Sequence, residues 1–354
     1  MFRILLLVCL SLFQSYATFA NTGFREIRVA DEGVRPLDVA LWYPTNQNNT
    51  VETIGENIVF VGTKAVRNAA PAPGKHPLVL LSHGYGGSWR NLNWLASQLA
   101  KEGYIVAAPN HPGTTTQDKS PHAARELWQR PRDLSRTLDK ILAEPGLAGG
   151  VDPRRIAAVG HSLGGWTVLM LAGGRFEPMR FMNDCRVHAA LAVCKLASTL
   201  GIDPSASAAK LANSARDPRI SAVILFDAGL LRGFTPASLR QLNVPVLILA
   251  AQVDSTQLPA ELESDYIAAH LPVENMRYAS VAGATHFSFM QLCKPGAEKV
   301  IEAHEPGEGI VCQDGSGASR AVIHQHLAKE VSHFLLSAFE PRAPRVGTLL
   351  GSGR

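Results

Sequence analysis

The chain has 354 residues, of which 46% are hydrophobic and 18% are charged, a composition typical of a globular protein with a well-buried core. Its formal net charge of +4 is not gathered in a basic run, so the charge pattern indicates no nucleic-acid partner. The length fits one large α/β domain or two small ones, and the sequence predicts no particular oligomeric state.

The first 20 residues, MFRILLLVCLSLFQSYATFA, have the pattern of a secretory signal peptide. Arg3 gives a positive start, residues 4–13 form a short apolar run, and the segment ends in a cleavage site after Ala20, with Ala17 as the alternative. The apolar run is too short to span a bilayer, and no other run is long enough. We therefore expect an exported protein, periplasmic or secreted, whose mature chain has no transmembrane segment.

Along the rest of the chain, apolar runs alternate with helical patterns, which predicts a largely parallel sheet covered by helices on both faces. The first two strands alternate as exposed edge strands do. Between residues 174 and 217 the pattern weakens, so we expect a cap-like insertion there in a single domain over 21–354. The predicted strands are 24–31, 37–45, 76–84, 103–113, 154–161, 220–227, 244–254 and 276–286, and the predicted helices are 92–101, 130–144, 166–173 and 324–339.

Residues 160–164, GHSLG, fit the pattern GxSxG between an apolar strand and an apolar helix. A sharp turn from strand to helix strains the central residue, and only small neighbours let the chain pass so closely. Such a turn exposes the Ser162 hydroxyl at the top of the sheet, which predicts a nucleophile. The alternative interpretation is a glycine-rich turn that only closes a strand.

A serine nucleophile needs a base and an acid that orients it, in the chain order serine, acid, histidine. His286 follows the last predicted strand and a glycine turn, so it is the predicted base. We expect the other histidines near the C-terminus, at positions 324, 326 and 333 of the final helix, to be exposed to solvent.

Two carboxylates end consecutive strands, so both emerge at the same edge of the sheet. We place Asp254 first as the acid, because its strand comes directly before the histidine strand. Asp227 ends the preceding strand and is the alternative; it also suits the capping of a loop through backbone N–H groups.

The loop HGYGG, residues 83–87, follows an early strand, where the second donor to an oxyanion is expected. The backbone N–H groups of Tyr85 and Leu163 are the predicted donor pair. Phosphate binding is the competing interpretation of such a loop, but neither GxxxxGK nor GxGxxG spacing is present.

Four cysteines remain after removal of the leader: Cys185, Cys194, Cys293 and Cys312. An even number in an oxidising compartment predicts two disulfides. Pairing of neighbours, Cys185 with Cys194 and Cys293 with Cys312, is the simplest of the three connectivities. A metal site is the alternative, but no CxxC pair is present, so we expect no metal.

The chain resembles the α/β-hydrolases and, within that fold, bacterial predicted dienelactone hydrolases related to platelet-activating-factor acetylhydrolase. The resemblance is strongest in residues 76–113, in GHSLGGWT and in the pair Cys293/Cys312. Dienelactone hydrolases have a cysteine nucleophile at the place of Ser162. The chain is also similar to cutinase-like polyester hydrolases through HGYGGS, GHSLGG, ILAAQVD and GATHF. The cutinase resemblance implies Asp254 as the acid, and the acetylhydrolase resemblance implies Asp227.

These features predict an exported serine esterase that cleaves carboxylic esters through an acyl-enzyme, without a metal or an organic cofactor. The resemblance implies a small-molecule or lipid ester as substrate, either a short-acyl ester or a phospholipid-type ester. Two alternatives remain open. One is a serine peptidase or amidase on the same fold, which shares the triad, and the other is an exported binding protein without catalysis.

Overall fold

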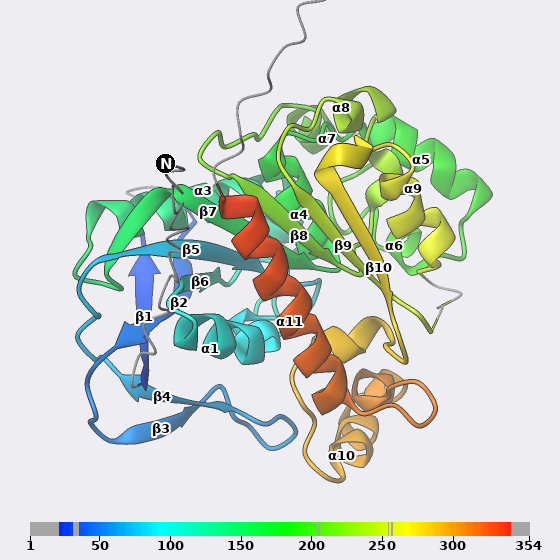
Figure 1. The fold of residues 1–354 in the computed structure, drawn as a ribbon. Helices are drawn as coiled ribbons and strands as arrows, with labels where there is room; N and C mark the ends of the chain where they lie inside the picture. The colour runs from blue at the N-terminus through cyan, green and yellow to red at the C-terminus, as the bar shows by residue number, and fades with distance from the viewer. Residues whose placement is uncertain (1–20, 31–34, 204–205, 254, 256–257, 341–354) are drawn as a thin grey trace, which may run out of the picture.

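One mixed sheet of ten strands runs through the described residues, which are 21–30, 35–203, 206–253, 255 and 258–340 of a computed structural model (Figure 1). The six neighbouring strands from β10 to β6 are mutually parallel, and β2 joins them antiparallel to β6. The carboxyl ends of the parallel strands meet at one edge, where loops bring distant residues together. In spatial order the strands are β10 (Met276–Val281), β9 (Val246–Ala251), β8 (Ala222–Phe226), β7 (Gly150–His161), β5 (Lys75–Ser82), β6 (Ile105–Pro109), β2 (Leu37–Thr45), β1 (Asn21–Val29), β4 (Thr63–Arg67) and β3 (Val51–Ile54).

Helices cover both faces of this sheet. Helices α1 and α11 pack against one face, in front of the sheet in Figure 1, and α3 and α4 contribute to a separate apolar core on the other. The prediction of a largely parallel sheet with helices on both faces is confirmed. The helices are α1 (Asn93–Lys101), α2 (Pro121–Ala124), α3 (Arg130–Ala143), α4 (Leu163–Ala172), α5 (Pro178–Val187), α6 (Ala192–Lys195), α7 (Ala206–Leu211), α8 (Pro236–Arg240), α9 (Ser264–Ala268), α10 (Ala297–His304) and α11 (Arg320–Phe339).

The first two strands differ from their prediction as edge strands. Strand β2 lies between β6 and β1, and all of its residues except Asp38 are buried. Strands β3 and β4, which the sequence analysis does not predict, follow β1 in the sheet, and β3 takes the edge position. Strand β3 has the sequence VETI, three of whose four side chains are exposed. Such a short, polar run carries no apolar alternation, so its pairing with β4 depends on the neighbouring strand.

Residues 174–217, the predicted cap-like insertion, contain α5, α6 and α7 between α4 and β8. A disulfide between Cys185 and Cys194 joins α5 to α6, with 5.4 Å between the two Cα atoms. Helix α6 packs against the loop that follows β8, because a Cβ atom on Gly229 would lie 3.1 Å from Cγ1 of Val193. The segment therefore lies beside the carboxyl edge of the sheet.

The second disulfide joins Cys293 and Cys312, with 5.8 Å between their Cα atoms, and closes the chain segment that contains α10. Both disulfides are the neighbour pairs of the simplest connectivity. The predicted leader, residues 1–20, lies outside the described residues.

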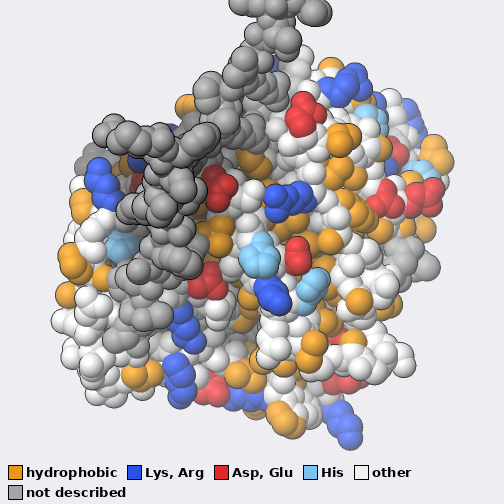
Figure 2. Space-filling model, in the orientation of Figure 1, with side chains coloured by type: hydrophobic (Ala, Val, Ile, Leu, Met, Phe, Trp, Pro, Cys, Tyr) orange, Lys and Arg blue, Asp and Glu red, His pale blue; other side chains and the backbone are white. Residues whose placement is uncertain are grey.

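No helix of the described part of the chain is both long enough and apolar enough to span a bilayer. On the face drawn in Figure 2, positively and negatively charged side chains are interspersed with hydrophobic ones. The described residues also contain no group of three or more His, Cys, Asp or Glu side chains placed to hold a metal ion.

One of the histidines expected to be solvent-exposed is buried. His326 and His333 on α11 are exposed, but His324 is only 7% exposed and stacks on Trp94, with ring centroids 3.8 Å apart. Its Nε2 is 3.1 Å from the carbonyl oxygen of Ser288. The helical pattern does not reveal this, because burial depends on α1, which supplies Trp94. Burial lowers the pKa of His324 to about 4.

His324 is expected to make the protein sensitive to acid. Its unfolded-state pKa of about 6.5 exceeds its folded-state value of about 4, so the unfolded chain binds more protons between these values. The neutral, buried ring makes its full contribution to the free energy of unfolding above pH 6.5. As the pH falls toward 4, the free energy of unfolding decreases by at most about 3 kcal/mol on this account. In urea unfolding at pH 7 and pH 4.5, His324→Gln should therefore lose less stability than the wild type. The exposed-site control His326→Gln should behave as the wild type does; equal acid sensitivity in all three proteins would contradict this expectation.

Candidate active site

Ser162 lies in the sharp turn between the end of β7 and the start of α4. Its backbone has φ 56° and ψ −122°, a strained conformation for a non-glycine residue that costs about 1–3 kcal/mol. The Ser162 N–H donates to the carbonyl of Phe226 at 3.0 Å, and the Ser162 carbonyl accepts from the N–H of Gly165 at 2.9 Å. These bonds hold the turn in its strained form at the carboxyl edge of the parallel strands.

The glycines on either side of Ser162 are required by close backbone contacts. A Cβ atom on Gly160 would lie 2.0 Å from the carbonyl oxygen of Gly164, and one on Gly164 would lie 1.9 Å from the carbonyl oxygen of Ser82. Both distances are far inside van der Waals contact, and both partners are backbone atoms that cannot rotate away. Only glycine therefore lets the turn pack against the end of β5.

A Gly164→Ala substitution is expected to destabilise the protein by about 3 kcal/mol, because the new methyl group forces β5 and α4 apart. Urea unfolding measures this change. Gly146→Ala is the matched control, since no atom lies within 4 Å of the added Cβ atom, and it should change stability by less than about 0.5 kcal/mol. Equal stability of the two variants would contradict the tight contact.

The imidazole of His286 lies between a hydroxyl and a carboxylate. His286 begins a short 3-10 helix, His286–Phe289, after β10. Its Nε2 is 3.1 Å from Oγ of Ser162, and its Nδ1 is 2.6 Å from Oδ2 of Asp227. Because a carboxylate only accepts hydrogen bonds, the proton is on Nδ1, and Nε2 presents its lone pair to the hydroxyl.

Asp227 follows the last residue of β8 and has a positive φ of 39°. Its backbone N–H donates to the carbonyl of Leu249, and its Oδ1 accepts from the N–H of Ala251, both at 2.9 Å. The neighbouring strand β9 thus fixes the carboxylate, which is 7% exposed. A narrow crevice borders the imidazole; its lining is Asp227, Ala251, Val253, Ser255, Leu258, Ala260 and His286.

Asp254, which the sequence analysis places first as the acid, lies outside the described residues. The carboxylate that contacts His286 is that of the alternative, Asp227. The position of Asp227 follows from the strand that it ends. Strand β8 is the direct neighbour of β7, and the N–H of Ser162 bonds to Phe226, the residue just before Asp227.

Two further groups hold the loop that carries His286. Nε2 of the buried His161 is 2.9 Å from the carbonyl oxygen of His286, and the two rings lie 4.8 Å apart. Burial lowers the pKa of His161 to about 3, so its ring is neutral and donates this bond. On the other side, Oγ1 of Thr285 donates to the carbonyl of Gln313, next to the disulfide residue Cys312. The sequence analysis does not single out His161, although its place inside GxSxG is a signal for it.

The glycine loop, residues 83–87, passes close to Ser162. A Cβ atom on Gly84 would lie 3.1 Å from Cβ and 3.5 Å from Oγ of Ser162. Within the described backbone, no carbonyl accepts a hydrogen bond from the N–H of Tyr85, the next residue. Leu163 is the first residue of α4, where the N–H groups have no acceptor inside the helix.

Parts of the chain are similar to known proteins. Cutinase est1 of Thermobifida alba is 32% identical over 99 residues, which cover 27% of this chain and 30% of that protein. The platelet-activating factor acetylhydrolase of Cavia porcellus is 26% identical over 185 residues, covering 37% of this chain and 42% of that protein. The matches thus span less than half the length of either relative. The resemblances to cutinases and to this acetylhydrolase are confirmed.

A ferulic acid esterase from Streptomyces cinnamoneus has a similar structure, with a TM-score of 0.61 and 25% identity over 91% of both chains. A model of the alpha/beta hydrolase family matches residues 78–292, which extend from β5 to beyond His286 and include Ser162 and Asp227. Because this match covers more than half of the chain and the whole arrangement of serine, histidine and aspartate, the protein belongs to the alpha/beta hydrolase family.

Proposed function

We propose that the protein hydrolyses carboxylic esters, with Ser162 as nucleophile, His286 as general base and Asp227 as the acid that orients the imidazole. The observation that carries this proposal is the continuous hydrogen-bonded chain from Oγ of Ser162 through the ring to Asp227, with distances of 3.1 Å and 2.6 Å. The similarity to a cutinase, a ferulic acid esterase and an acetylhydrolase favours an ester over an amide as substrate.

In the first half of the reaction, Oγ of Ser162 bonds to the ester carbonyl carbon while Nε2 of His286 takes the hydroxyl proton. The carbonyl oxygen becomes an oxyanion that accepts from the N–H groups of Tyr85 and Leu163. The carbon–oxygen bond to the alcohol then breaks, and His286 gives its proton to the departing oxygen. The Asp227 carboxylate stabilises the imidazolium that exists between these two proton transfers.

In the second half, water attacks the acyl group on Ser162, and His286 takes one of its protons. The new oxyanion accepts hydrogen bonds from the same two N–H groups. The bond to Oγ breaks, the proton returns to Ser162, and the carboxylic acid leaves. Each half therefore uses His286 once as base and once as acid, and the enzyme ends in its starting state.

The substrate class that we propose is a small-molecule or lipid ester with a short acyl group. Support comes from the similarity to an acetylhydrolase and from the cap-like segment beside the site, where α6 packs against the loop after β8. We also propose that the protein acts in an oxidising compartment after export, because its two disulfides are typical of such compartments.

Labelling with a fluorophosphonate tests the proposal at the nucleophile. The wild type should bind one equivalent covalently, and peptide mapping should place the label on Ser162. A panel of p-nitrophenyl esters and the matched anilides should show faster ester cleavage. An unlabelled wild type would contradict the proposed catalysis and favour a binding protein, and faster anilide cleavage would favour an amidase.

A further inference from the structure

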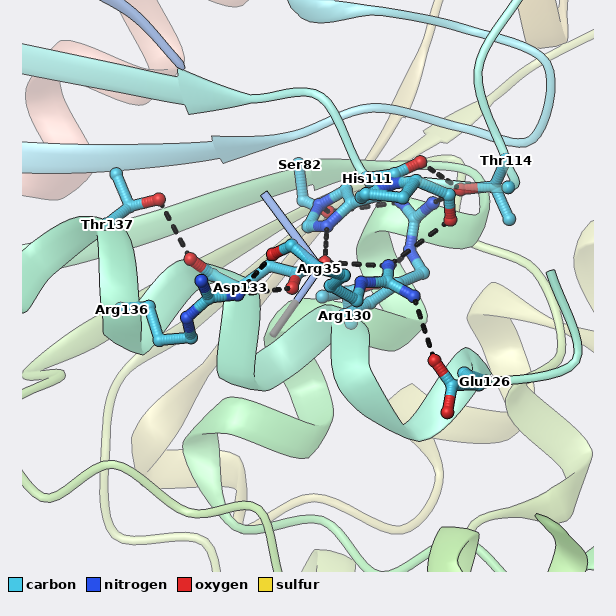
Figure 3. Close-up of polar contacts among 12 residues, drawn as sticks. Arg35, Ser82, His111, Thr114, Glu126, Arg130, Asp133, Arg136 and Thr137 are labelled. Atoms are coloured by element: carbon cyan, nitrogen blue, oxygen red, sulfur yellow. Dashed lines mark hydrogen bonds and ion pairs between the residues drawn. The ribbon is translucent and has the colours of Figure 1, made fainter. Parts of the chain in front are cut away.

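The buried guanidinium of Arg130 lies near Thr114 and near Ser82, the residue just before the glycine loop (Figure 3). Arg130, the first residue of α3, is only 1% exposed. Its Nε donates to Oγ1 of Thr167 at 2.9 Å, and one terminal nitrogen, Nη1, donates to Oγ1 of Thr114 at 2.6 Å. Burial lowers the pKa of Arg130 to about 9, which keeps it charged at neutral pH, and the nearby Asp133 stabilises that charge. Burial of a charged group costs free energy, so a buried guanidinium with these defined partners indicates a specific structural role for Arg130.

The other terminal nitrogen of Arg130, Nη2, contacts the strand end that leads into the glycine loop. It donates to the carbonyl of His83 and to Oγ of Ser82, the latter at 3.3 Å. The Ser82 hydroxyl donates to Nε2 of His111, 3.0 Å away, because the proton of that ring is on Nδ1, which faces Asp133. Nδ1 of His111 in turn donates to Asp133 at 2.9 Å, so every proton in this chain has a defined position.

His83 connects this hydrogen-bond network to the glycine loop. Its Nε2 accepts from the backbone N–H of His111 at 3.0 Å, so the ring proton is on Nδ1, which donates to the carbonyl of Gly84 at 2.7 Å. The described peptide bonds are all trans, and in a trans peptide the C=O and the following N–H point in opposite directions. Holding the Gly84 carbonyl on the His83 side therefore turns the Tyr85 N–H away from the His83 ring.

The far side of the glycine loop is bonded to the segment that contains Thr114. The N–H of Gly86 donates to the Thr114 carbonyl at 2.9 Å, and the N–H of Thr116 donates to the Gly87 carbonyl at 3.0 Å. Oγ1 of Thr116 also donates to the carbonyl of Gly86 at 2.6 Å. Arg130 thus holds the loop at its start through His83 and at its far side through Thr114.

The remaining partner of Arg130 lies on the other side of the site. Thr167 belongs to α4, and its Oγ1 donates to the carbonyl of Leu163 at 3.0 Å while it accepts from Arg130. Leu163 is the second proposed oxyanion donor. One rigid, planar guanidinium therefore contacts the supports of both donors, Tyr85 on the glycine loop and Leu163 on the helix.

We propose that Arg130 is a positioning residue that fixes the separation of the Tyr85 and Leu163 N–H groups, so that they match the tetrahedral oxyanion rather than the planar ester. This inference rests on the proposed function. A donor pair fixed in this way stabilises the transition state more than the bound substrate, so its loss lowers kcat and leaves KM almost unchanged.

Threonine-to-valine variants test this role with little change in side-chain shape. Thr114→Val removes the bond between Arg130 and the far side of the glycine loop. Thr137→Val is the matched control. Thr137, on α3, is buried as Thr114 is, but its hydroxyl donates to the carbonyl of Asp133, one turn earlier in the same helix, and not to the glycine loop. Arg130→Lys keeps the charge and removes the planar fork. The values of kcat and KM are measured with p-nitrophenyl acetate. The affinity for an alkyl trifluoromethyl ketone, which forms a tetrahedral oxyanion on the serine, is measured as well, and both measurements are made well below the melting temperature of each variant.

Thr114→Val should lower kcat about 10-fold and Arg130→Lys about 100-fold, with KM within about 2-fold of the wild type. The affinity for the trifluoromethyl ketone should fall by the same factors, while Thr137→Val should match the wild type. Equal kcat in Thr114→Val and Thr137→Val would overturn the proposed role of Arg130 but not the proposed function. An unchanged affinity for the ketone in a variant whose kcat falls would do the same. A wild type that neither cleaves the ester nor binds the ketone would overturn the proposed function and this inference with it.

Discussion

A Ser162→Ala variant is expected to cleave p-nitrophenyl acetate with a kcat lower by on the order of a million-fold. The substitution leaves His286 with no hydroxyl to deprotonate, so no acyl-enzyme forms. A residual rate about a thousand-fold above that in water should remain, because the N–H groups of Tyr85 and Leu163 still polarise a bound ester. Steady-state kinetics with rigorously purified protein measure this, and the melting temperature should stay close to that of the wild type.

Ser162→Gly separates the catalytic role of this position from its backbone strain. Alanine must keep φ near 56°, whereas glycine adopts positive φ without a steric cost. The glycine variant should therefore be as inactive as the alanine variant but more stable by about 1 kcal/mol, after allowance for the greater freedom of glycine in the unfolded chain. Ester hydrolysis by the alanine variant above about 1% of the wild-type rate would show that Ser162 is not the nucleophile. A glycine variant less stable than the alanine variant would contradict the strain.

An Asp227→Asn variant is expected to lower kcat by about ten thousand-fold with little change in the fold. The asparagine oxygen can keep the bond to the N–H of Ala251, which directs its NH₂ group toward Nδ1 of His286. The ring would then carry its proton on Nε2 and present no lone pair to Ser162. Kinetics and melting temperature, measured on the same preparation, distinguish this loss of the base from loss of structure.

Asp254→Asn is the matched comparison for this experiment, since chain order alone favours Asp254 as the acid. Its kcat should stay within about 2-fold of the wild type, because Nδ1 of His286 is already bonded to Asp227. If Asp254→Asn lost activity and Asp227→Asn kept it, the acid would be Asp254. Loss of folding in Asp227→Asn together with full activity of its folded fraction would leave Asp227 a structural role only.

Local rules explain why parts of the site are predictable from sequence. The GxSxG turn is a local motif: the close contact of Gly160 is with the carbonyl of Gly164, four positions later, and Ser162 bonds to Gly165, although Gly164 also packs against Ser82 of the distant strand β5. The alternation of apolar runs and helical patterns predicts the parallel sheet for the same reason, since each element reflects its own periodicity. The short, polar strand β3 has no such pattern, and its place depends on its partner β4.

Long-range packing decides the features that the sequence leaves open. Arg130 and Asp133 of α3 are charged, yet both are buried. Arg130 bonds to Thr114 and to Thr167 of α4, and Asp133 bonds to His111, contacts that the sequence pattern of α3 does not reveal. His324 is buried for a comparable reason, through Trp94 of a helix more than 200 residues earlier in the chain.

The sequence by itself determined the sharp turn at Ser162, the alternation of strands and helices and the order of serine, aspartates and histidine along the chain. Only the tertiary structure decided which carboxylate reaches His286, because that depends on β8 lying beside β7 in the sheet and on the path of the loop after β8. Periodicity fixes what each segment becomes, whereas the pairing of strands, set by packing between distant segments, fixes which side chains meet.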